Sequence, residues 1–231
     1  RPVPASGRVL KIHVIRAALT AVMAYLFFFG LTRIPLAQAI GLSFIAPIIT
    51  LFLAVPILGE RIGANAKLAA VLGFVGVMVV VGGELLAVDE GSDAVGMAAV
   101  LVSAVMYAFN LVLQRMQALV ARPLEIAFYQ NTIVFLMLLV GVPFAVSWPA
   151  SSYQWGGAAL AAGLAVGSLM LMSLAYRQAE AQRLVVIEYT AFIWAAIMGW
   201  WFFAEPITAR TLLGTGLIVL GCLVSARGGS R

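Results

Sequence analysis

One acidic residue, Glu188, lies inside an apolar segment in which a charge is costly. It is the fifth residue of the run 184–203, LVVIEYTAFIWAAIMGWWFF, which is long enough to cross a bilayer. A carboxylate there costs at least about 2–3 kcal/mol unless it faces a cavity or a partner. Its default role is functional, because it can bind an amine of a substrate or take up a proton. An ion pair with Arg183 or Arg177 is the alternative interpretation.

Two aromatic residues could act together with this carboxylate. Tyr189 adjoins Glu188, and Trp194 follows deeper in the same run. Their rings could stack on an aromatic or cationic substrate, and packing in a protein core explains them equally well. The aromatic clusters at 27–29 and 200–203 lie near one end of their runs and are typical of an interfacial belt.

Amide and hydroxyl side chains form a further candidate site. They recur at helical spacing from the middle of the run 94–113, so one helix face carries Ser103, Tyr107, Asn110 and Gln114. The run 125–146 carries Tyr129, Gln130 and Asn131. Unpaired amides are costly in lipid, so we expect these faces to point inward. Substrate binding by Tyr107, Asn110 and Asn131 and hydrogen bonding between helices both fit this pattern, and Gln114 and Gln130 rank lower.

Residues that perform enzyme chemistry are scarce and isolated. His13 is the single histidine, Cys222 is the single cysteine, and Asp89 and Asp93 share one loop. No cluster has the spacing of metal ligands, no nucleophile has a base within helical reach, and no phosphate-binding loop motif occurs. We therefore predict that the chain is not an enzyme and that it uses no metal or cofactor.

The composition is that of a membrane protein. Of the 231 residues, 64% are hydrophobic and 10% are charged, whereas soluble domains are about half apolar and a quarter charged. The mean hydropathy is +1.08. The net charge of +5 comes from Lys and Arg that are scattered singly or in pairs, without the basic stripe that binds nucleic acid. The expected partners are the bilayer and a small solute, and no nucleic acid. Proton coupling and a homodimer stay open.

Eight apolar runs of about 17 to 22 residues predict an all-α polytopic membrane protein, since about 20 residues cross the hydrocarbon core and none of the runs alternates like a β-barrel strand. The runs are 14–31, 36–57, 66–83, 94–113, 125–146, 155–175, 184–203 and 211–227. With the N-terminus inside, twelve Lys and Arg fall on the inner side and only Arg33 and Arg210 on the outer side. This bias predicts that both ends of the chain are cytoplasmic.

The chain contains an internal repeat. Residues 34–76 align with 179–221 without a gap, although only eight of the 43 positions are identical. Each copy has a glutamate after its apolar run, Glu60 at a predicted inner turn and Glu205 at a predicted outer turn, so the copies are expected to be inverted. Inverted repeats are common in secondary transporters. We predict an incomplete first repeat at 1–84 with three spans and a second at 94–227 with five, two N-terminal helices being absent from the first.

Comparison of the two copies separates residues that match, which are expected to be structural, from residues that differ between the copies. Glu60 and Glu205 match and are expected to cap helices or act in gating. Gly76 and Gly221 match and are expected to let helices approach closely. Pro47 offers a kink in the middle of its predicted helix, and because Phe192 is its counterpart the hinge is expected on one side only. Ser43 is the counterpart of Glu188, so we expect an electrically asymmetric cavity.

These segments resemble the EamA-type transporters of the drug/metabolite transporter superfamily. The first copy has Ala46-Pro47, then Leu58-Gly59-Glu60-Arg61 and a glycine-rich helix with Gly73 and Gly76; the second has Ala204-Glu205-Pro206 and Gly214, Gly216 and Gly221. The resemblance implies two inverted five-helix bundles around a central cavity, in a carrier of amino acids, other metabolites or drug-like molecules in a bacterial inner membrane. The chain departs from the pattern at the front, where the family's first two helices are not seen.

We therefore expect a multi-pass secondary transporter of the bacterial inner membrane that moves a small organic metabolite, such as an amino acid, an amine or a drug-like solute, by alternating access. Glu188, Tyr189, Trp194, Tyr107, Asn110 and Asn131 are the candidate substrate-binding residues. The alternative is a polytopic membrane enzyme, or a non-transporting scaffold or truncated paralogue.

Overall fold

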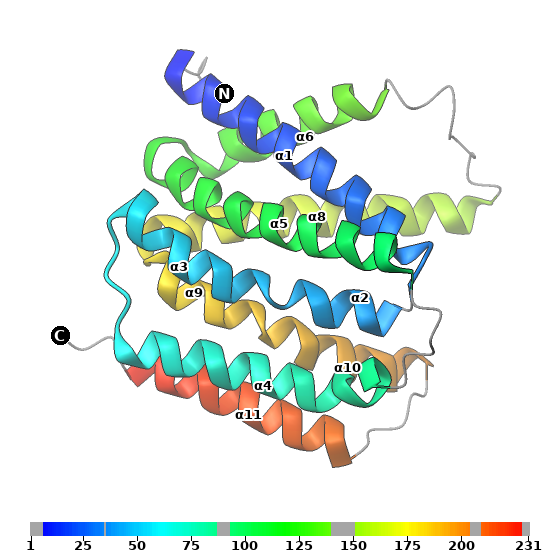
Figure 1. Cartoon of the computed structure of the whole chain (residues 1–231). Coiled ribbons are helices and arrows are strands. Elements are labelled where there is room, and N and C mark those ends of the chain that lie inside the picture. The colour runs from blue at the N-terminus through cyan, green and yellow to red at the C-terminus, as the bar shows by residue number, and fades with distance from the viewer. Residues whose placement is uncertain (1–6, 35, 87–92, 140–150, 204–208, 228–231) are drawn as a thin grey trace. The chain divides into compact units, whose positions relative to one another are not determined.

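The secondary structure follows from the backbone's need for internal hydrogen bonds in hydrocarbon, which a helix meets within its own segment. The computed structural model describes residues 7–34, 36–86, 93–139, 151–203 and 209–227 (Figure 1). All regular elements in these ranges are α-helices, as predicted. Four helical segments are long and apolar enough to cross a membrane: Val9–Leu31, Ala39–Leu58, Ala94–Val120 and Ser152–Gln178. With the shorter apolar helices, they make the chain a polytopic membrane protein.

The helices group into two compact units. The first unit contains Arg1–Val22 and Leu113–Ala179, and the second contains Met23–Val112 and Glu180–Arg231. Helices α1 (Gly7–Leu31) and α5 (Ala94–Val120) each contribute one end to each unit. The rest of the first unit consists of α6 (Pro123–Leu139) and α8 (Ser152–Gln178), which pack against each other. The Ser151 hydroxyl begins α8 by accepting a hydrogen bond from the backbone N–H of Gln154.

The second unit contains the two aligned copies of the repeat. The first copy forms α2 (Leu36–Ser43), α3 (Ala46–Leu58) and α4 (Ala64–Leu86). The second copy forms α9 (Ala181–Glu188), α10 (Thr190–Phe203) and α11 (Ala209–Arg227). In the alignment of 34–76 with 179–221, α4 and α11 are therefore equivalent helices.

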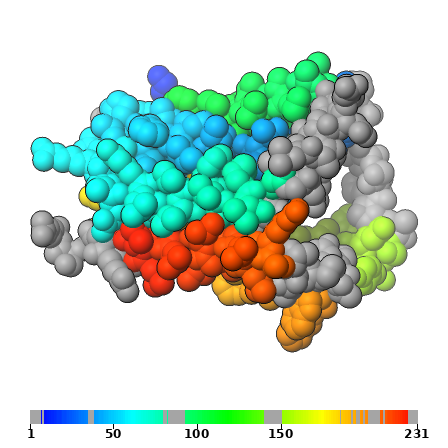
Figure 2. Space-filling model, turned by 60° about the horizontal axis from the view of Figure 1, so that its bottom comes forward, coloured from blue at the N-terminus to red at the C-terminus, as the bar shows by residue number. Residues whose placement is uncertain are grey.

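Helices α4 and α11 pack side by side in antiparallel directions (Figures 1 and 2). A Cβ atom on Gly76 would lie 2.6 Å from the carbonyl oxygen of Gly214, and one on Gly221 would lie 2.9 Å from that of Ala69. Gly76 is the counterpart of Gly221, and Ala69 is the counterpart of Gly214. The repeat thus makes the same backbone contact twice, in opposite directions. The predicted close approach at Gly76 and Gly221 is present, and the antiparallel pairing supports an inverted repeat.

Two helices that were predicted to be continuous, 36–57 and 184–203, are each divided in the structure. The predicted helix 36–57 is divided at Phe44 and Ile45 into α2 and α3, and the predicted helix 184–203 is divided at Tyr189 into α9 and α10. The two positions coincide in the repeat, because Phe44 is the counterpart of Tyr189. A hinge in one copy only therefore stays a prediction, although both copies depart from regular helical hydrogen bonding at equivalent positions. Proline is not required for the interruption in the second copy.

Side-chain hydroxyls donate to backbone carbonyls of the preceding turn near both interruptions. The Ser43 hydroxyl donates to the Ala39 carbonyl at 2.9 Å, and the Thr190 hydroxyl donates to the Ile187 carbonyl at 2.6 Å. Pro47 lies in the first turn of α3, where its missing N–H leaves no helical bond unmade. Pro47 therefore lies at the start of α3, and the kink that was expected in the middle of the predicted helix coincides with a short turn at Phe44 and Ile45, where Ile45 keeps helical dihedral angles.

The two interruptions meet in the core of the second unit. The rings of Phe44 and Tyr189 stack with their centroids 5.7 Å apart, and the Tyr189 hydroxyl donates to the Phe44 carbonyl at 3.4 Å. The Tyr189 ring also lies against Gly73 of α4, where a Cβ would be 2.4 Å from a ring carbon. Tyr189 packs with Val77 and Ile218 in a buried apolar cluster. The absence of a side chain at Gly73 therefore creates the space that Tyr189 occupies.

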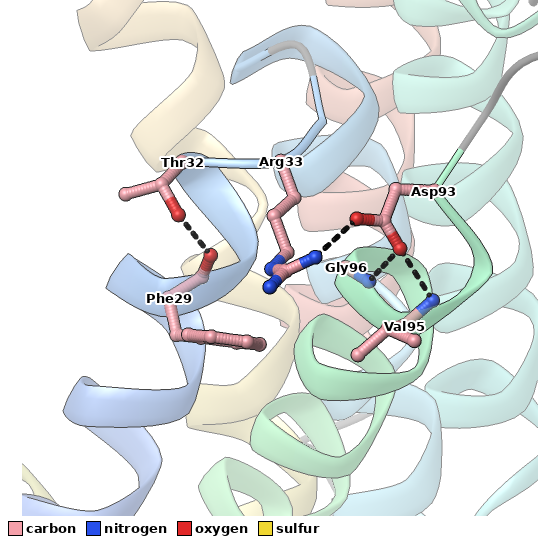
Figure 3. Close-up of polar contacts among 6 residues, drawn as sticks. All are labelled: Phe29, Thr32, Arg33, Asp93, Val95 and Gly96. Atoms are coloured by element: carbon pink, nitrogen blue, oxygen red, sulfur yellow. Dashed lines mark hydrogen bonds and ion pairs between the residues drawn. The ribbon is translucent and has the colours of Figure 1, made fainter.

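An ion pair joins the segment after α1 to the residue that precedes α5 (Figure 3). The Arg33 guanidinium donates to Asp93 Oδ2 at 2.6 Å and lies 4.7 Å from the centroid of the Phe29 ring. Asp93 Oδ1 accepts from the backbone N–H groups of Val95 and Gly96, so Asp93 caps α5. The hydrogen bond from Arg33 holds the pKa of the Asp93 carboxyl below its ordinary value, and the bond from Gly96 adds to this effect.

The substitution Gly76→Ala is expected to destabilise the protein by about 1–3 kcal/mol, because a methyl group there must push two backbones apart. Gly216→Ala on α11 is the matched control, since nothing lies within 4 Å of its added Cβ, and it is expected to be neutral or slightly stabilising. Thermal unfolding of both variants in detergent measures the difference. Equal unfolding temperatures for the two variants would contradict the close backbone contact.

Asp93→Asn is expected to lower the unfolding temperature at neutral pH. Because the folded pKa of Asp93 is depressed, its ionised form contributes stability above the ordinary aspartate pKa of about 3.9, and this contribution is lost as the pH falls through the lowered value. The wild type and the variant should therefore converge in acid. Arg33→Gln should cause the same loss without adding to that of Asp93→Asn. A difference that does not depend on pH would exclude the ionic contribution.

Candidate functional site

A cavity of about 320 Å³ lies within the second unit and is lined by three helices. Helix α1 contributes apolar side chains, α2 contributes one hydroxyl, and α5 contributes two hydroxyls and a methyl group. The lining residues are Met23, Ala24, Phe27, Phe28, Ser43, Ser103, Ala104 and Tyr107. The cavity is therefore an apolar space with a few hydroxyl groups, a lining that is common in small-molecule sites.

Tyr107 connects this cavity to the intramembrane carboxylate. Its hydroxyl donates to Glu188 Oε2 at 2.8 Å. Tyr107 is brought there by α5, which packs on α3 through the buried alanines Ala46, Ala104 and Ala108. Glu188 is the last residue of α9, beside the interruption at Tyr189. The carboxylate thus has a neutral hydrogen-bond donor as its partner, in place of the Arg183 or Arg177 ion pair that was the alternative.

The two copies of the repeat contribute different groups to this region. Ser43 lines the cavity directly, whereas its counterpart Glu188 is joined to it through Tyr107. Ser103 is committed to a backbone contact, because its hydroxyl donates to the Met23 carbonyl at 2.7 Å. Glu188 is therefore not among the lining residues but is one hydrogen bond away from one of them, Tyr107.

The other predicted binding residues lie elsewhere. Tyr189 is fully buried in the core and does not line the cavity. Asn110 is buried on α5 with 4% exposure, three residues beyond Tyr107. Trp194 on α10 is 61% exposed and is not among the lining residues. Asn131 belongs to the first unit, where its exposed side chain donates to the Ala127 carbonyl of its own helix. Of the predicted set, Tyr107 lines the cavity and Glu188 is bonded to Tyr107.

Glu60 lies at a helix terminus, as its position after an apolar run suggested. Its Oε1 accepts from the backbone N–H of Ala181 at 3.2 Å, and Ala181 is the first residue of α9. The carboxylate therefore caps a helix of the other copy of the repeat, where the helix dipole favours negative charge. The Gln182 side chain adds a second link by accepting from the backbone N–H of Gly63. Glu205 lies outside the described residues.

Sequence reasoning missed a polar network in the first unit. His13, Arg16, Gln114 and Gln117 are almost fully buried and bonded to one another. Of these four residues, His13 was considered from the sequence only as an isolated histidine, and Gln114 was ranked low as a binding residue. The signal that could have found the network is helical spacing, since His13 and Arg16 are three residues apart, as are Gln114 and Gln117.

The groups at the cavity can support noncovalent binding and proton transfer. The part of the chain that the structure describes contains no group of three or more His, Cys, Asp or Glu side chains that could hold a metal ion. Glu188 and Tyr107 form a carboxylate–phenol pair, and Ser43 and Ser103 add hydroxyl groups to the cavity lining. Such a pair can accept an amine, or it can take up a proton when the carboxylate leaves its partner.

Comparison with known proteins places this geometry in context. A riboflavin transporter of Rhizobium johnstonii is 27% identical over 226 residues, covering 95% of this chain and 71% of the relative. The pseudopaline exporter CntI of Pseudomonas aeruginosa is 28% identical over 224 residues, covering 92% of this chain and 74% of the relative. A protein of known crystal structure has the same fold, with a TM-score of 0.75 at 20% identity, covering 96% of this chain and 79% of that one.

The model of the EamA-like transporter family matches residues 2–82 and 94–227, which include α2, α3, α9, α10 and the cavity-lining residues. The resemblance inferred from the short motifs of the two copies is thereby confirmed. The chain belongs to the EamA-like transporter family.

Proposed function

We propose that this protein is a secondary transporter that binds a small organic solute in the cavity of the second unit and moves it by alternating access. The observation that carries the proposal is the hydrogen bond from Tyr107, which lines the cavity, to Glu188. An intramembrane carboxylate is costly unless it has a partner or a function. Here its partner is a hydroxyl at a cavity wall, which a ligand can displace.

The cavity suggests the form of the solute. Its apolar walls, with Phe27 and Phe28, suit a hydrophobic or aromatic body, and Glu188 suits an amine or another hydrogen-bond donor at one end. A volume of about 320 Å³ is at the small end of the range for ligand sites, so the solute is a small molecule. The names of the two relatives, a riboflavin transporter and a pseudopaline exporter, support solute transport over the enzyme or scaffold alternative.

The paired interruptions provide a means of movement. Both lie where the first and second copies meet, at Phe44 and Tyr189, and broken helices at a repeat interface are a common design of binding sites in transporters. Movement of α9 relative to α5 would change the Tyr107–Glu188 bond directly. Solute or proton binding at Glu188 would therefore be coupled to the arrangement of the helices. Trp194, Asn110 and Asn131 remain candidates for contacts in another conformation.

Glu188→Gln is expected to reduce solute flux at least about tenfold, because loss of a charge-assisted hydrogen bond costs about 1.5–3 kcal/mol. Tyr107→Phe is expected to cause a smaller loss, about fivefold, because it removes a single hydroxyl. Flux is measured in proteoliposomes with a panel of aromatic and aliphatic amines and riboflavin, over a pH series.

Glu180→Gln is the matched control, since Glu180 is an exposed carboxylate bonded to Gln182, and it is expected to leave flux unchanged. Wild-type flux by Glu188→Gln at every pH would exclude a role for this carboxylate in binding or in proton coupling. Transport by the wild type that is independent of pH, combined with loss in the variant, would assign Glu188 to solute binding alone.

We further propose that the protein lies in a bacterial inner membrane with both chain ends in the cytoplasm. Twelve of its Lys and Arg fall on one predicted side and two on the other, and such an excess marks the cytoplasmic side. Reporter fusions after Glu90 and after Arg122 are expected to give external and internal signals, respectively. The reverse pattern would overturn the orientation.

A further inference from the structure

A series of hydrogen-bonded polar side chains connects three helices of the first unit. His13 and Arg16 lie on α1, Gln117 lies on α5 and Glu125 lies on α6. Arg16 donates to Gln117 Oε1 at 2.8 Å, Gln117 Nε2 lies 2.8 Å from His13 Nδ1, and His13 Nε2 lies 3.4 Å from Glu125 Oε1. His13 and Gln117 are fully buried and Arg16 is 3% exposed. His13 and Arg16 belong to the candidate span Val9–Leu31.

Arg16, at one end of this series of hydrogen bonds, determines which atom donates and which accepts in each of the others. A guanidinium can only donate, so the Gln117 carbonyl must face Arg16. The Gln117 NH₂ group then faces His13 and donates to Nδ1, which must carry a lone pair. The proton of the neutral imidazole is therefore on Nε2, from which it is directed at the Glu125 carboxylate. The described contacts thus assign His13 to one tautomer and to the neutral state.

The charged and titratable groups around His13 come from each helix that packs on it. Helix α1 contributes Arg16, and α6 contributes Glu125 and Tyr129, whose ring stacks on the imidazole with centroids 4.8 Å apart. From α5, Gln114 and Gln117 are neutral, while the charged Arg115 donates to the Tyr176 carbonyl of α8. With neutral His13, Arg16 and Glu125 balance in charge.

We propose that His13 and Glu125 form a proton-binding site that is separate from Glu188. A proton from a hydronium ion adds to the lone pair of His13 Nδ1, so one O–H bond of hydronium breaks, one N–H bond forms and water is left. Two donors then face each other, so the Gln117 amide must turn away from His13, and its bond to Arg16 changes with it. At the same time the imidazolium and Glu125 become an ion pair. Protonation therefore weakens the contact between α1 and α5 and strengthens the contact between α1 and α6.

This site does not depend on the proposed transport cycle. Its residues all belong to the first unit, whereas Tyr107 and Glu188 belong to the second. The Glu125 side chain is 14% exposed, so Glu125 is the accessible end of this series of hydrogen-bonded groups. Histidine is the side chain whose charge ordinarily changes between about pH 5 and 8. The proton is therefore the ligand that this arrangement suits, without a further cofactor.

The single histidine makes the test direct. The full-length protein, labelled with ¹⁵N-histidine and held in lipid nanodiscs, gives one pair of ring nitrogen signals, because His13 is the one histidine in the chain. At about pH 8 these signals should show protonated Nε2 and unprotonated Nδ1, and Nδ1 should gain a proton as the pH falls toward about 5. A protonated Nδ1 at high pH, or no change over this range, would overturn the proposal.

Two isosteric variants test the partners. Gln117→Glu places a carboxylate that accepts from protonated Nδ1 and from Arg16, so proton affinity should rise at least about tenfold. Glu125→Gln removes the carboxylate beside Nε2, so the affinity should fall at least about tenfold. Glu180→Gln, an exposed carboxylate of the second unit, should leave the titration unchanged. Coincident titrations in all four proteins would show that His13 titrates without these partners and would overturn the assigned site.

Discussion

The second unit depends on the close approach of the α4 and α11 backbones. Where Gly76 meets Gly214 and Gly221 meets Ala69, the space is too small for an additional carbon atom. Lipid supplies no hydrophobic force that would bring two apolar helices together, so close packing of small residues must do so. Since the two contacts are related by the repeat, each copy contributes half of the same interface. The inverted duplication is therefore also the means by which the unit is held together.

The candidate site is built outward from this interface. Gly73 lies on the same helix face as Gly76 and leaves a space for the Tyr189 ring. Tyr189 stacks on Phe44, so the position of the Tyr189 ring determines where the two interrupted helices meet. Glu188 precedes Tyr189 directly, and its carboxylate is thereby directed to Tyr107. Tyr189, a predicted substrate-binding residue, is buried beside Glu188, whose carboxylate is bonded to Tyr107 at the cavity wall.

The sequence predicted those features that depend on one segment or on comparison of the two copies. Apolar runs marked the helices, because a membrane segment must pair its own backbone groups, and matched glycines marked the α4–α11 contact. The interruption at Tyr189 could not be predicted in this way, since it depends on a space at Gly73, more than a hundred residues away. His13 was set aside for the same reason: its partners Gln117 and Glu125 are about as distant in the chain.

The antiparallel pairing of α4 with α11 also affects the order in which the chain can fold. Helix α4 ends at Leu86 and α11 begins at Ala209, so synthesis of the intervening segment takes on the order of ten seconds at ordinary translation rates. During this interval the glycine-lined face of α4 has no native partner, and the contacts to be made span most of the chain. The second unit can therefore be completed only after α11 has been synthesised and has packed against α4, which precedes it by more than a hundred residues.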